Sequence, residues 1–504
     1  MIKAMFKAWA SALLCVSLSV EVAASPTIRE RTTDLRALLT DPARQWAANT
    51  TVSFPGSTNF ENATERYSIF NQPTYTAAVS PGTEGDISKV INLAKSYNFP
   101  FLARAGGHGG ANMSDFENGV SLDLSKFNSI VINSAAQTMT VGPGVHYRDI
   151  FDPLYNAGFY IQTGSCSCPS VIGVAIGGGV GRLMGKLGLT TDALQSVRLV
   201  GADGVVKTVS ATSYPDLRWA IRGAGANYGV ITSATFKIQP LSNNNGGNAF
   251  MLDFVLPAEK SLEYLNIIEK SFNPMPVNLA GIIVFNWNST HNVSQVVSDW
   301  IFFGTEADAR KTLAPILALN ATFITATLPW NRIISVSGGG SDALNCVPNK
   351  LRNTFNLNLK TYSAAGWQQS FETLTDFLQK YPNGRGSQVI LELFANNATA
   401  AVPSSETSWP WRDVRGFFQE LFVYDTGDSV TAQGAATYGS QLRSQFAAYS
   451  GYSTPTVFVN YARGDERIED VYGADKLPRL AQLKQKYDPN NLFAYGHPIP
   501  LSYP

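Results

Sequence analysis

The sequence predicts an α+β protein with two domains, the second of which has one antiparallel sheet backed by helices. Its 504 residues are 44% hydrophobic and 15% charged, which is long enough for two domains and too apolar for general disorder. Over residues 70–240, short strand-like and helix-like segments alternate. After the loop 243–247 the chain consists of strand-like runs separated by helix-like stretches, which is typical of a sheet with helices packed on it.

The N-terminus has the pattern of a secretory signal peptide. Lys3 and Lys7 precede an apolar run over residues 8–20, and small residues follow at 22–24. The run is too short to span a bilayer. We therefore expect residues 1–24 to be a signal peptide cleaved after Ala24, with a buried N-terminal helix as the alternative, and residues 25–67 to form an N-terminal segment.

Sequons for N-glycosylation support secretion. Seven Asn-x-Ser/Thr patterns occur, at Asn49, Asn62, Asn112, Asn288, Asn292, Asn320 and Asn397. Together with a signal peptide they predict a secreted or secretory-pathway protein with a glycosylated surface.

The first domain is expected over residues 68–240. Asp86 would cap a helix that Pro100 stops, and residues 101–104 form a short strand that enters a glycine loop. Residues 120–124 alternate apolar and polar side chains, as a half-buried strand should. Asp203-Gly204 predicts a hairpin between two short strands.

The second domain is expected over residues 241–455. Strand-like runs lie at 281–287, 389–394 and 417–424. The last segment, residues 456–504, is distinct again, with a helix that runs to Tyr487.

Charge and cysteine content exclude several classes of protein. Lysine plus arginine equals aspartate plus glutamate at 38 each, so the chain lacks the basic footprint of a nucleic-acid binder and of a polybasic membrane contact. Removal of Cys15 with the signal leaves Cys166, Cys168 and Cys346. Three cysteines form no disulfide framework, and the odd number predicts another role for at least one of them. The sequence is silent on oligomeric state.

The first chemical signal is the segment Arg-Ala-Gly-Gly-His-Gly-Gly at residues 104–110. Glycines there would let backbone N–H groups approach a phosphate, and Arg104 could add charge. His108 could ligate a metal, act as a base or attach to a cofactor. Metal binding is disfavoured because none of the other three histidines has a zinc-type spacing to it.

The second signal is a pair of cysteines, Cys166 and Cys168, followed by a glycine run at residues 177–181. This is neither a Rossmann fingerprint, which needs its glycines tightly between strand and helix, nor a Cys-x-x-Cys redox motif. The two glycine-rich loops together suggest one nucleotide cofactor held from two sides.

These motifs resemble the berberine-bridge-enzyme-like flavoproteins of the vanillyl-alcohol-oxidase superfamily. The resemblance rests on Arg-x-Gly-Gly-His, on the cysteine eleven residues before Gly-Gly-Gly-x-Gly, and on Gly-Leu-x-x-Asp at residues 188–192. Gly-x-Gly-x-Asn-Tyr-Gly-Val at 223–230 and the C-terminal Asn460-Tyr461 and Lys-Tyr-Asp-Pro-x-Asn elements extend it. It covers residues 70–240 and 457–498 well and the region between them loosely.

The resemblance implies a PCMH-type FAD-binding domain over residues 68–240, completed by residues 456–504, with a substrate domain between them. His108 matches the histidine bonded to the flavin 8α carbon, and Cys166 the cysteine bonded to flavin carbon 6. Cys168 carries the proline that often follows that cysteine, so either cysteine, or a single histidyl link, remains open. The expected cofactor-binding residues are His108, Cys166, Arg104, Ala105, Gly106, Gly107, Gly109, Gly164, Ser165, Gly173, Gly177, Gly178, Gly181, Gly188, Asp192, Gly229, Val230 and Asn491, with no metal site.

The expected reaction is oxidation of a small organic substrate. A flavin bonded to the protein has a raised potential and a fixed position, which favours taking a hydride, while a buried tyrosine or carboxylate removes a proton. The candidate bases are Tyr461, Glu392 and Glu420, and molecular oxygen would reoxidise the flavin to give H2O2, although a dehydrogenase is also possible. The substrate is expected to be a secondary metabolite. The alternatives are a carbohydrate oxidase, with residues Trp409 and Trp411 stacking on a sugar, and a non-catalytic flavin-containing binding protein.

Overall fold

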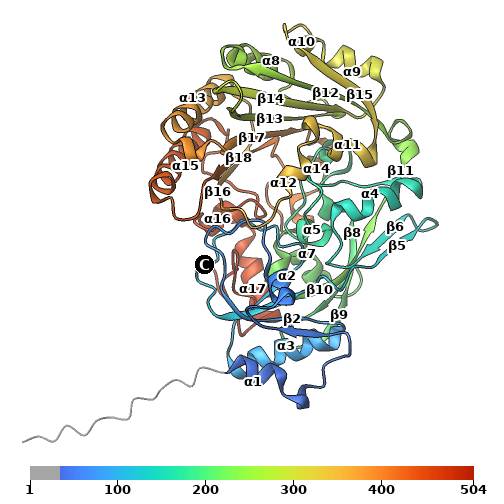
Figure 1. Cartoon of the computed structure of the whole chain (residues 1–504). Helices are drawn as coiled ribbons and strands as arrows, with labels where there is room; N and C mark the ends of the chain where they lie inside the picture. The colour runs from blue at the N-terminus through green and yellow to red at the C-terminus, as the bar shows by residue number, and fades with distance from the viewer. Residues whose placement is uncertain (1–33) are drawn as a thin grey trace, which may run out of the picture.

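The structure is a computed structural model that describes residues 34–504; the expected signal peptide at residues 1–24 lies outside the described residues. The chain has the predicted α+β architecture, in which sheets of four, five and seven strands and a two-stranded sheet of β7 (Phe159–Tyr160) and β11 (Gln239–Pro240) pack together with helices. Figure 1 shows the large sheet at the top and the N-terminal sheet at the bottom. Within the described part of the chain, no helix combines the length and the hydropathy that a membrane span requires.

The N-terminal sheet has four strands in the order β1-β2-β4-β3. β2, β4 and β3 are parallel, whereas β1 is antiparallel to β2. Ile87 and Val90 of helix α3 share one apolar core with Val120 of β4. The elements are α1 (Leu35–Thr40), β1 (Thr51–Ser53), α2 (Thr58–Thr64), β2 (Tyr75–Ser80), α3 (Glu84–Tyr97), β3 (Phe101–Arg104) and β4 (Gly119–Asp123).

The second sheet has five antiparallel strands in the order β5-β6-β10-β8-β9. The predicted hairpin is present, since β8 and β9 pair across the turn at Asp203. The elements are β5 (Ile130–Asn133), β6 (Thr138–Val141), α4 (Tyr147–Asn156), β7 (Phe159–Tyr160), α5 (Val171–Ala175), α6 (Met184–Leu187), β8 (Leu194–Val200), β9 (Val206–Val209), α7 (Pro215–Ala224), β10 (Val230–Lys237) and β11 (Gln239–Pro240).

The substrate domain is built on a seven-stranded antiparallel sheet in the order β15-β12-β14-β13-β17-β18-β16. Its strands are β12 (Asn248–Pro257), β13 (Leu279–Asn288), β14 (Val293–Phe302), β15 (Phe323–Pro329), β16 (Arg352–Leu359), β17 (Gln388–Phe394) and β18 (Gly416–Val423). Its helices are α8 (Ser261–Ser271), α9 (Glu306–Thr312), α10 (Ala314–Leu317), α11 (Ile333–Val336), α12 (Asp342–Asn345), α13 (Ala364–Lys380), α14 (Asn397–Ala401) and α15 (Ser429–Tyr449).

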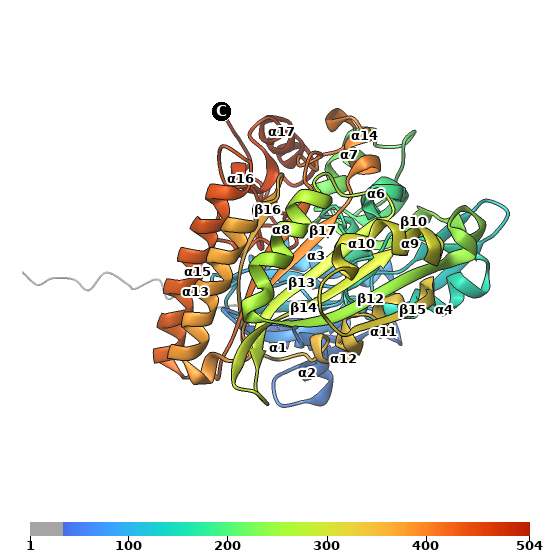
Figure 2. The same ribbon diagram turned by 90° about the horizontal axis from the view of Figure 1, so that it is seen from above.

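The two faces of this sheet have different surroundings. Helices α8, α13 and α15 cover one face, as Figure 2 shows from above. Because side chains alternate along a strand, Phe418 of β18 points to this helix face, where it stacks on Phe446 of α15 with ring centroids 3.4 Å apart. Gln419 and, on β17, Glu392 point to the opposite face, which we call the open face.

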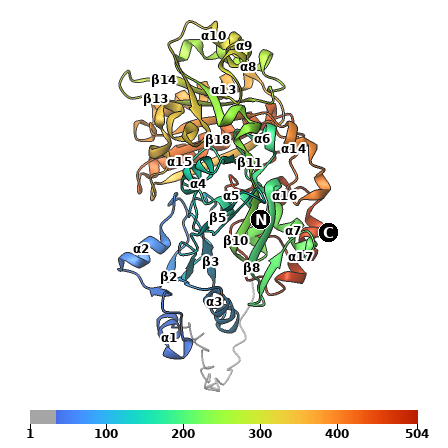
Figure 3. The same cartoon turned by 90° about the vertical axis from the view of Figure 1, so that its right-hand side faces the viewer.

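The C-terminal segment returns to the first domain, as expected. Helices α16 (Ile468–Tyr472) and α17 (Leu477–Tyr487) follow the substrate domain, and α17 packs beside α7 (Figure 3). The Lys484 ammonium is fully buried and bonds Asp488 at 2.7 Å and the carbonyls of Asn227 and Phe493. Phe493 also packs edge-on against Phe101 of the N-terminal sheet. The tail is therefore part of the first domain's core.

Two local expectations are corrected. Residues 25–67 are not a separate segment where they are described, because β1 joins the N-terminal sheet. The helix begins earlier than Asp86: Thr83 caps α3 by accepting from the Asp86 backbone N–H. Asp86 itself is buried and accepts from the Thr50 hydroxyl and the Lys89 ammonium, so its charge ties α3 to the preceding loop.

Candidate active site

His108 lies on the loop after β3 and stacks on Tyr67, whose other face contacts a group of the substrate domain. Its ring stacks on Tyr67 with centroids 3.9 Å apart and planes 16° from parallel. The Arg352 guanidinium of β16 lies 3.8 Å from the Tyr67 centroid. A ring has two faces, so Arg352 must occupy the face that His108 leaves. The stack fixes the plane of the imidazole from the substrate-domain side.

The environment of His108 keeps its imidazole neutral. Burial lowers its pKa to about 3, and the positive charge of Arg352 and the nearby His146 and Arg66 act in the same direction. A neutral imidazole retains a nitrogen lone pair for bond formation. The site therefore presents a rigid, nucleophilic histidine at physiological pH.

The cysteines are divided between two roles. Cys168 forms a disulfide with Cys346, a pairing that the sequence analysis did not expect. Among the three cysteines of residues 34–504, Cys166 alone is free. Its sulfur lies 3.6 Å from His108 Nε2 and 3.1 Å from the Cys168 sulfur. The thiol available beside His108 is thus that of Cys166, and burial raises its pKa to about 12.

An acid–base pair completes the site. The Tyr461 hydroxyl donates to Glu392 Oε2 at 2.9 Å, joining the C-terminal module to β17. Burial raises the pKa of Glu392, while the Ser165 and Tyr461 hydroxyls oppose that shift. Burial and the Glu392 charge raise the pKa of Tyr461 well above its usual value, and Cys166 contributes in the same direction. The pair therefore lies within electrostatic reach of the free thiol.

The third candidate base does not join this group. Glu420 is next to Gln419 on β18, so alternation places it on the helix face. It is fully buried, with neither carboxyl oxygen hydrogen-bonded in the described chain. Burial raises its pKa well above the usual value, and only the charge of Arg443 on α15 opposes the shift. The sheet separates Glu420 from Tyr461, so we discard it as a catalytic base.

The charge next to the glycine loop comes from a different arginine than expected. Arg104 is paired with Asp123 at 3.0 Å and donates to the Glu65 carbonyl, so it serves the N-terminal sheet. Arg66, which the sequence analysis missed, donates to the Gly109 carbonyl at 3.0 Å. Its Nε is buried without a hydrogen-bond partner in the described chain. Arg66 is therefore the cation available at this loop.

The glycines of the two loops fall into two groups. A Cβ at Gly109, Gly164 or Gly173 would meet no atom closer than 3.6 Å, so the protein's own atoms do not require glycine there. The others are glycine because protein atoms are too close. A Cβ at Gly106, Gly107, Gly177, Gly178 or Gly181 would come within 2.8 Å of neighbouring protein atoms. Ala105 completes the loop, half-buried.

The glycine run is held by the C-terminal module. A Cβ at Gly177 would lie 1.9 Å from Asn460 Oδ1, and Asn460 donates to the Val174 carbonyl at 2.9 Å. The Asn-Tyr element thus has two functions, since Asn460 holds the run and Tyr461 reaches Glu392. The run was expected to help hold a nucleotide cofactor, and close packing against the C-terminal module also requires glycine at Gly177.

Five expected cofactor residues have structural roles in the described chain. Asp192 is bound in a fork by Arg412 at 2.8 and 2.9 Å and contacts Arg222. Gly188 has a positive φ of 77°, and a Cβ there would meet Asp192. Gly229 also has a positive φ and abuts Val200, Val230 is in the apolar core, and Asn491 is an exposed left-handed residue after α17.

The site has features that fit FAD. A neutral imidazole and a free thiol lie side by side, in loops whose Gly109 and Gly164 are not required by contacts with other protein atoms. Buried donors without partners in the described chain include Arg66 Nε and Gln162 Nε2, which suit a ligand rich in acceptor atoms. The structure also brings in Tyr67, Arg352 and Arg66, for which the sequence offered no signal.

Comparison with known proteins agrees with this fit. Residues 75–210 match the FAD binding domain family and residues 457–500 match the family described as berberine and berberine like. FAD-linked oxidoreductase fogF of Aspergillus ruber is 41% identical over 480 residues, covering 95% of this chain and 97% of that protein. FAD-linked oxidoreductase OXR1 of Pyricularia oryzae is 40% identical over 466 residues, covering 90% of each.

Solved structures share the fold. BBE-like 1 of Physcomitrella patens superposes with a TM-score of 0.79 at 23% identity, covering 90% of this chain and 98% of that one. Xylooligosaccharide oxidase of Myceliophthora thermophila gives a TM-score of 0.76 at 22% identity, covering 90% and 97%. The predicted fold class is confirmed. The chain is an enzyme that belongs to the berberine-bridge-enzyme-like FAD-linked oxidoreductases.

Proposed function

We propose that this enzyme is a secreted oxidase that holds FAD covalently through His108 and Cys166 and oxidises a small apolar metabolite, with Tyr461 and Glu392 as the proton acceptor. The observation that carries the proposal is the Tyr461–Glu392 hydrogen bond of 2.9 Å, set beside the only free thiol of the described chain. A binding protein would have no use for a buried acid–base pair at its cofactor.

The chain's own groups provide the proton transfer. Tyr461 donates its proton to Glu392, which leaves lone pairs of the phenol oxygen for an O–H or N–H of the substrate. Tyr461 can accept that proton as it passes its own to Glu392, so no charge accumulates on the phenol. Bound FAD supplies the two-electron acceptor.

The disulfide supports Cys166 as the second attachment residue. Cys168 is consumed by its bond to Cys346, so only Cys166 offers a thiol beside His108. The stacked, neutral His108 is the proposed main anchor. Molecular oxygen is the proposed final electron acceptor, which yields H2O2.

The open face favours an apolar substrate over a sugar. Its half-exposed residues include five aliphatic side chains, Ile282, Val284, Val297, Ile390 and Leu421, beside polar ones such as Asn286 and Gln419. Of the two tryptophans proposed to stack on a sugar, Trp409 is 1% exposed and packed in an apolar cluster. Trp411 is half-buried, and its Nε1 donates to the carbonyls of Val457 and Val471.

Secretion stays a proposal that the sequons support. Asn49, Asn62, Asn292, Asn320 and Asn397 are exposed in the structure, while Asn112 and Asn288 are partly buried. Glycans could therefore attach at the first five without unfolding.

A substrate screen tests the proposed activity. Purified protein is supplied in air with a panel of aromatic and terpenoid alcohols and amines, and in parallel with mono- and oligosaccharides, and H2O2 is measured. We expect peroxide from members of the apolar panel only. Peroxide from the sugars alone would favour the carbohydrate oxidase. Loss of flavin colour in deoxygenated buffer without peroxide in air would identify a dehydrogenase.

A further inference from the structure

A second polar cluster lies on the open face, away from Tyr461. Arg182, immediately after the glycine run, bonds Asp299 of β14 through Nη2. Asp253 of β12 lies directly opposite Asp299 in the sheet and accepts from the Gly339 N–H at 3.1 Å. All three residues are more than nine-tenths buried.

This cluster has more hydrogen-bonding capacity than the protein uses. Arg182 Nε and Nη1, Asp253 Oδ1 and Asp299 Oδ1 are buried without a partner in the described chain. Leaving a buried donor or acceptor unpaired costs about 1–3 kcal/mol, and more for a charged group. Such a concentration of unsatisfied groups in one place needs an explanation, and a bound ligand would satisfy them.

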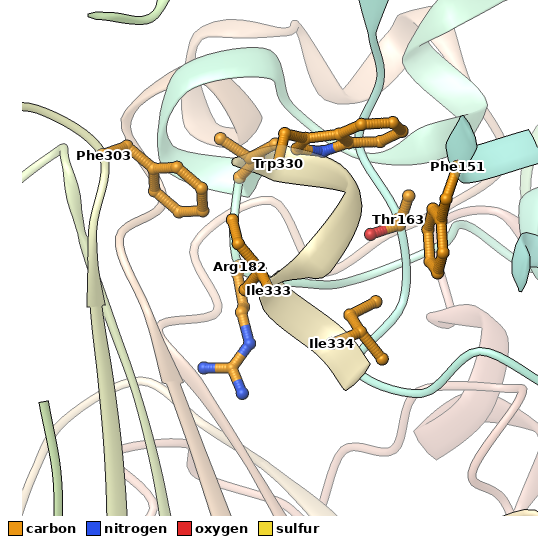
Figure 4. A pocket seen from close by; sticks show the side chains of 8 residues that line it. Phe151, Thr163, Arg182, Phe303, Trp330, Ile333 and Ile334 are labelled. Carbon is orange, nitrogen blue, oxygen red and sulfur yellow. The ribbon is translucent and has the colours of Figure 1, made fainter. Parts of the chain in front are cut away.

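The Arg182 side chain is held in an extended position. Its stem lies along a pocket lined by Phe303, Trp330 and Ile333, while the guanidinium points out of that pocket toward the strands of the sheet (Figure 4). Apolar packing of the stem fixes the charged head with little remaining freedom. The unpaired donors at Nε and Nη1 are therefore preorganised.

The register of the sheet connects this cluster to the acid–base pair. Asp299 pairs with Ile282, and Ile282 pairs with Glu392, so these three residues form one row on one face. Neighbouring strands are about 4.8 Å apart, so Asp299 and Glu392 are separated by about 10 Å. The Arg182 charge also lowers the pKa of Glu392. Half-exposed Ile282 lies between the two polar ends.

The charges indicate which ligand atom fits. Burial and the Asp299 charge raise the pKa of Asp253 to about 7, and Asp299 is already paired with Arg182. The cluster therefore has no excess positive charge, and an anionic group would meet the Asp299 carboxylate as well as the guanidinium. A neutral acceptor oxygen avoids that repulsion and still takes hydrogen bonds from Arg182.

We propose that Arg182 is a specificity-determining residue that binds a neutral carbonyl oxygen of the substrate, about 10 Å along the open face from Glu392. This rests on the proposed function, because it places the reacting end of the substrate at Glu392. The substrate class is then an apolar, roughly bicyclic molecule with a ketone or aldehyde oxygen at the end remote from the reacting C–H.

Ligand titration tests this without knowledge of the true substrate. The flavin-containing protein is titrated with 2-acetonaphthone, naphthalene and 2-naphthoate, and binding is followed by the change in visible flavin absorbance. We expect 2-acetonaphthone to bind about tenfold or more tightly than either other probe, as one hydrogen bond to a charged donor implies. Arg182→Met keeps an apolar side chain of similar length and removes the guanidinium. It should therefore abolish the preference for 2-acetonaphthone and leave naphthalene binding unchanged.

Lys186→Met is the matched control, because it removes a cation four residues away on α6 that bonds Asn244 instead. It should preserve the preference. Equal binding of 2-acetonaphthone and naphthalene by the wild type, no spectral response to any probe, or tightest binding of 2-naphthoate would each overturn the proposal. These readouts hold even where Arg182→Met fails to fold. Absence of flavin from the wild type would instead contradict the proposed function.

Discussion

At the scale of single residues, the proposed catalysis depends on Glu392 as a proton acceptor whose pKa burial raises. Glu392 and Tyr461 come from segments 69 positions apart and meet because the C-terminal module folds back over the open face. Removal of a positioned acid–base group typically costs 10²–10⁴-fold in rate, to order of magnitude.

Glu392→Gln is expected to lower kcat by about 10²-fold or more while the flavin content stays at the wild-type level. Gln keeps the shape and the acceptor oxygen for Tyr461 but cannot take up the proton. Turnover and visible absorbance are measured on the same sample. The matched control is Glu420→Gln, an equally buried carboxyl on the helix face, which should leave kcat unchanged. A comparable rate loss in both variants would contradict the assignment.

The pH dependence follows from the direction of the Glu392 shift. Its carboxylate must be ionised to accept a proton, and burial raises its pKa above the ordinary value. Activity should therefore fall as the pH drops through this raised pKa, at a higher pH than for an exposed glutamate. Because the Arg182 charge lowers the same pKa, Arg182→Met should move this acidic limb to still higher pH. A limb that Arg182→Met leaves in place would show that the limb reports another group.

Single-residue reasoning from the sequence identified the local part of this site. His108 stands in a glycine-rich loop, and Tyr461 in a recognisable element, so their neighbours along the chain mark them. Tyr67 and Arg352 lie in no recognisable sequence motif. Their roles arise from a contact between residues 285 positions apart in the chain, which exists only in the folded protein. Arg104 was predicted to bind the cofactor because it directly precedes the glycine loop. In the structure its guanidinium is instead paired with Asp123 on the adjacent strand.

At the scale of elements, the sheet of the substrate domain carries a buried carboxyl on each face, Glu392 of β17 on the open face and Glu420 of β18 on the helix face. Burial raises the pKa of Glu420 well above the usual value, which favours its protonated form. The folded protein thus binds a proton at pH values where the unfolded chain has released it. Stability is full below the unfolded-state pKa and falls as the pH rises toward the folded-state pKa.

Glu420→Gln should therefore flatten the pH dependence of stability. We expect the variant to have a higher Tm than the wild type at pH 7 to 8 and a nearly equal Tm at pH 4, and thermal unfolding at these values measures it. Glu392→Gln is not an equivalent control because Glu392 is hydrogen-bonded. An unchanged Tm difference across the pH range would show that Glu420 does not titrate on unfolding.

The disulfide acts on the segment that covers the cysteine loop. Cys346 ends the stretch that begins with α11, and Asp342 in the same stretch accepts from the Ser167 N–H at 2.9 Å. Cys346→Ser removes a cross-link between residues 178 apart, so we expect the free energy of unfolding to fall by about 2–5 kcal/mol.

The same variant should alter flavin attachment. It frees the Cys168 thiol, whose sulfur already lies 3.3 Å from His108 Nε2. Cys168 would then compete with Cys166 for attachment to the flavin. Peptide mapping by mass spectrometry should find flavin on Cys168 or a Cys166–Cys168 disulfide in part of the sample. Attachment at Cys166 alone, as in the wild type, would show that the disulfide does not direct the link.

The sequence predicted most elements but misjudged their surroundings. Strand 120–124 has an alternating pattern and was expected to be half-buried, yet every residue of β4 is buried. The polar positions are satisfied internally, because the Ser121 hydroxyl donates to the Ala63 carbonyl and Asp123 pairs with Arg104. Alternation alone cannot distinguish a solvent-facing side from one lined with polar partners.

At the scale of the whole molecule, the C-terminal tail joins the two domains. It supplies Tyr461 to the substrate sheet, Asn460 to the glycine run and Phe493 to the N-terminal core. Lys484 is its buried link to Asn227 and Asp488.

Lys484→Met should therefore destabilise the molecule as a unit. It would leave the fully buried Asp488 carboxylate without its cation, which typically costs about 3–5 kcal/mol. We expect a lower Tm together with loss of flavin from the folded fraction, measured by thermal unfolding and absorbance. Lys486→Met, an exposed neighbour on the same helix, should have little effect. Loss of stability with intact flavin binding would mean that the tail is not needed to form the site.

The predicted domain boundaries rest on local signals, which are the change in the sequence pattern at the loop 243–247 and the motifs near the C-terminus. The sequence could not show that residues before 68 belong to the first sheet, since β1 is three residues long and carries no distinctive pattern.

The most direct test of the account is the visible absorbance of purified protein before and after acid precipitation. We predict that the washed wild-type pellet stays yellow, and that mass spectrometry finds FAD on peptides containing His108 and Cys166. His108→Ala should lose most of the retained colour, and the double variant with Cys166→Ala should release all of it. Release of all colour from the wild type would contradict the covalent anchor. A protein that stays colourless with added FAD would contradict the proposed function as a whole.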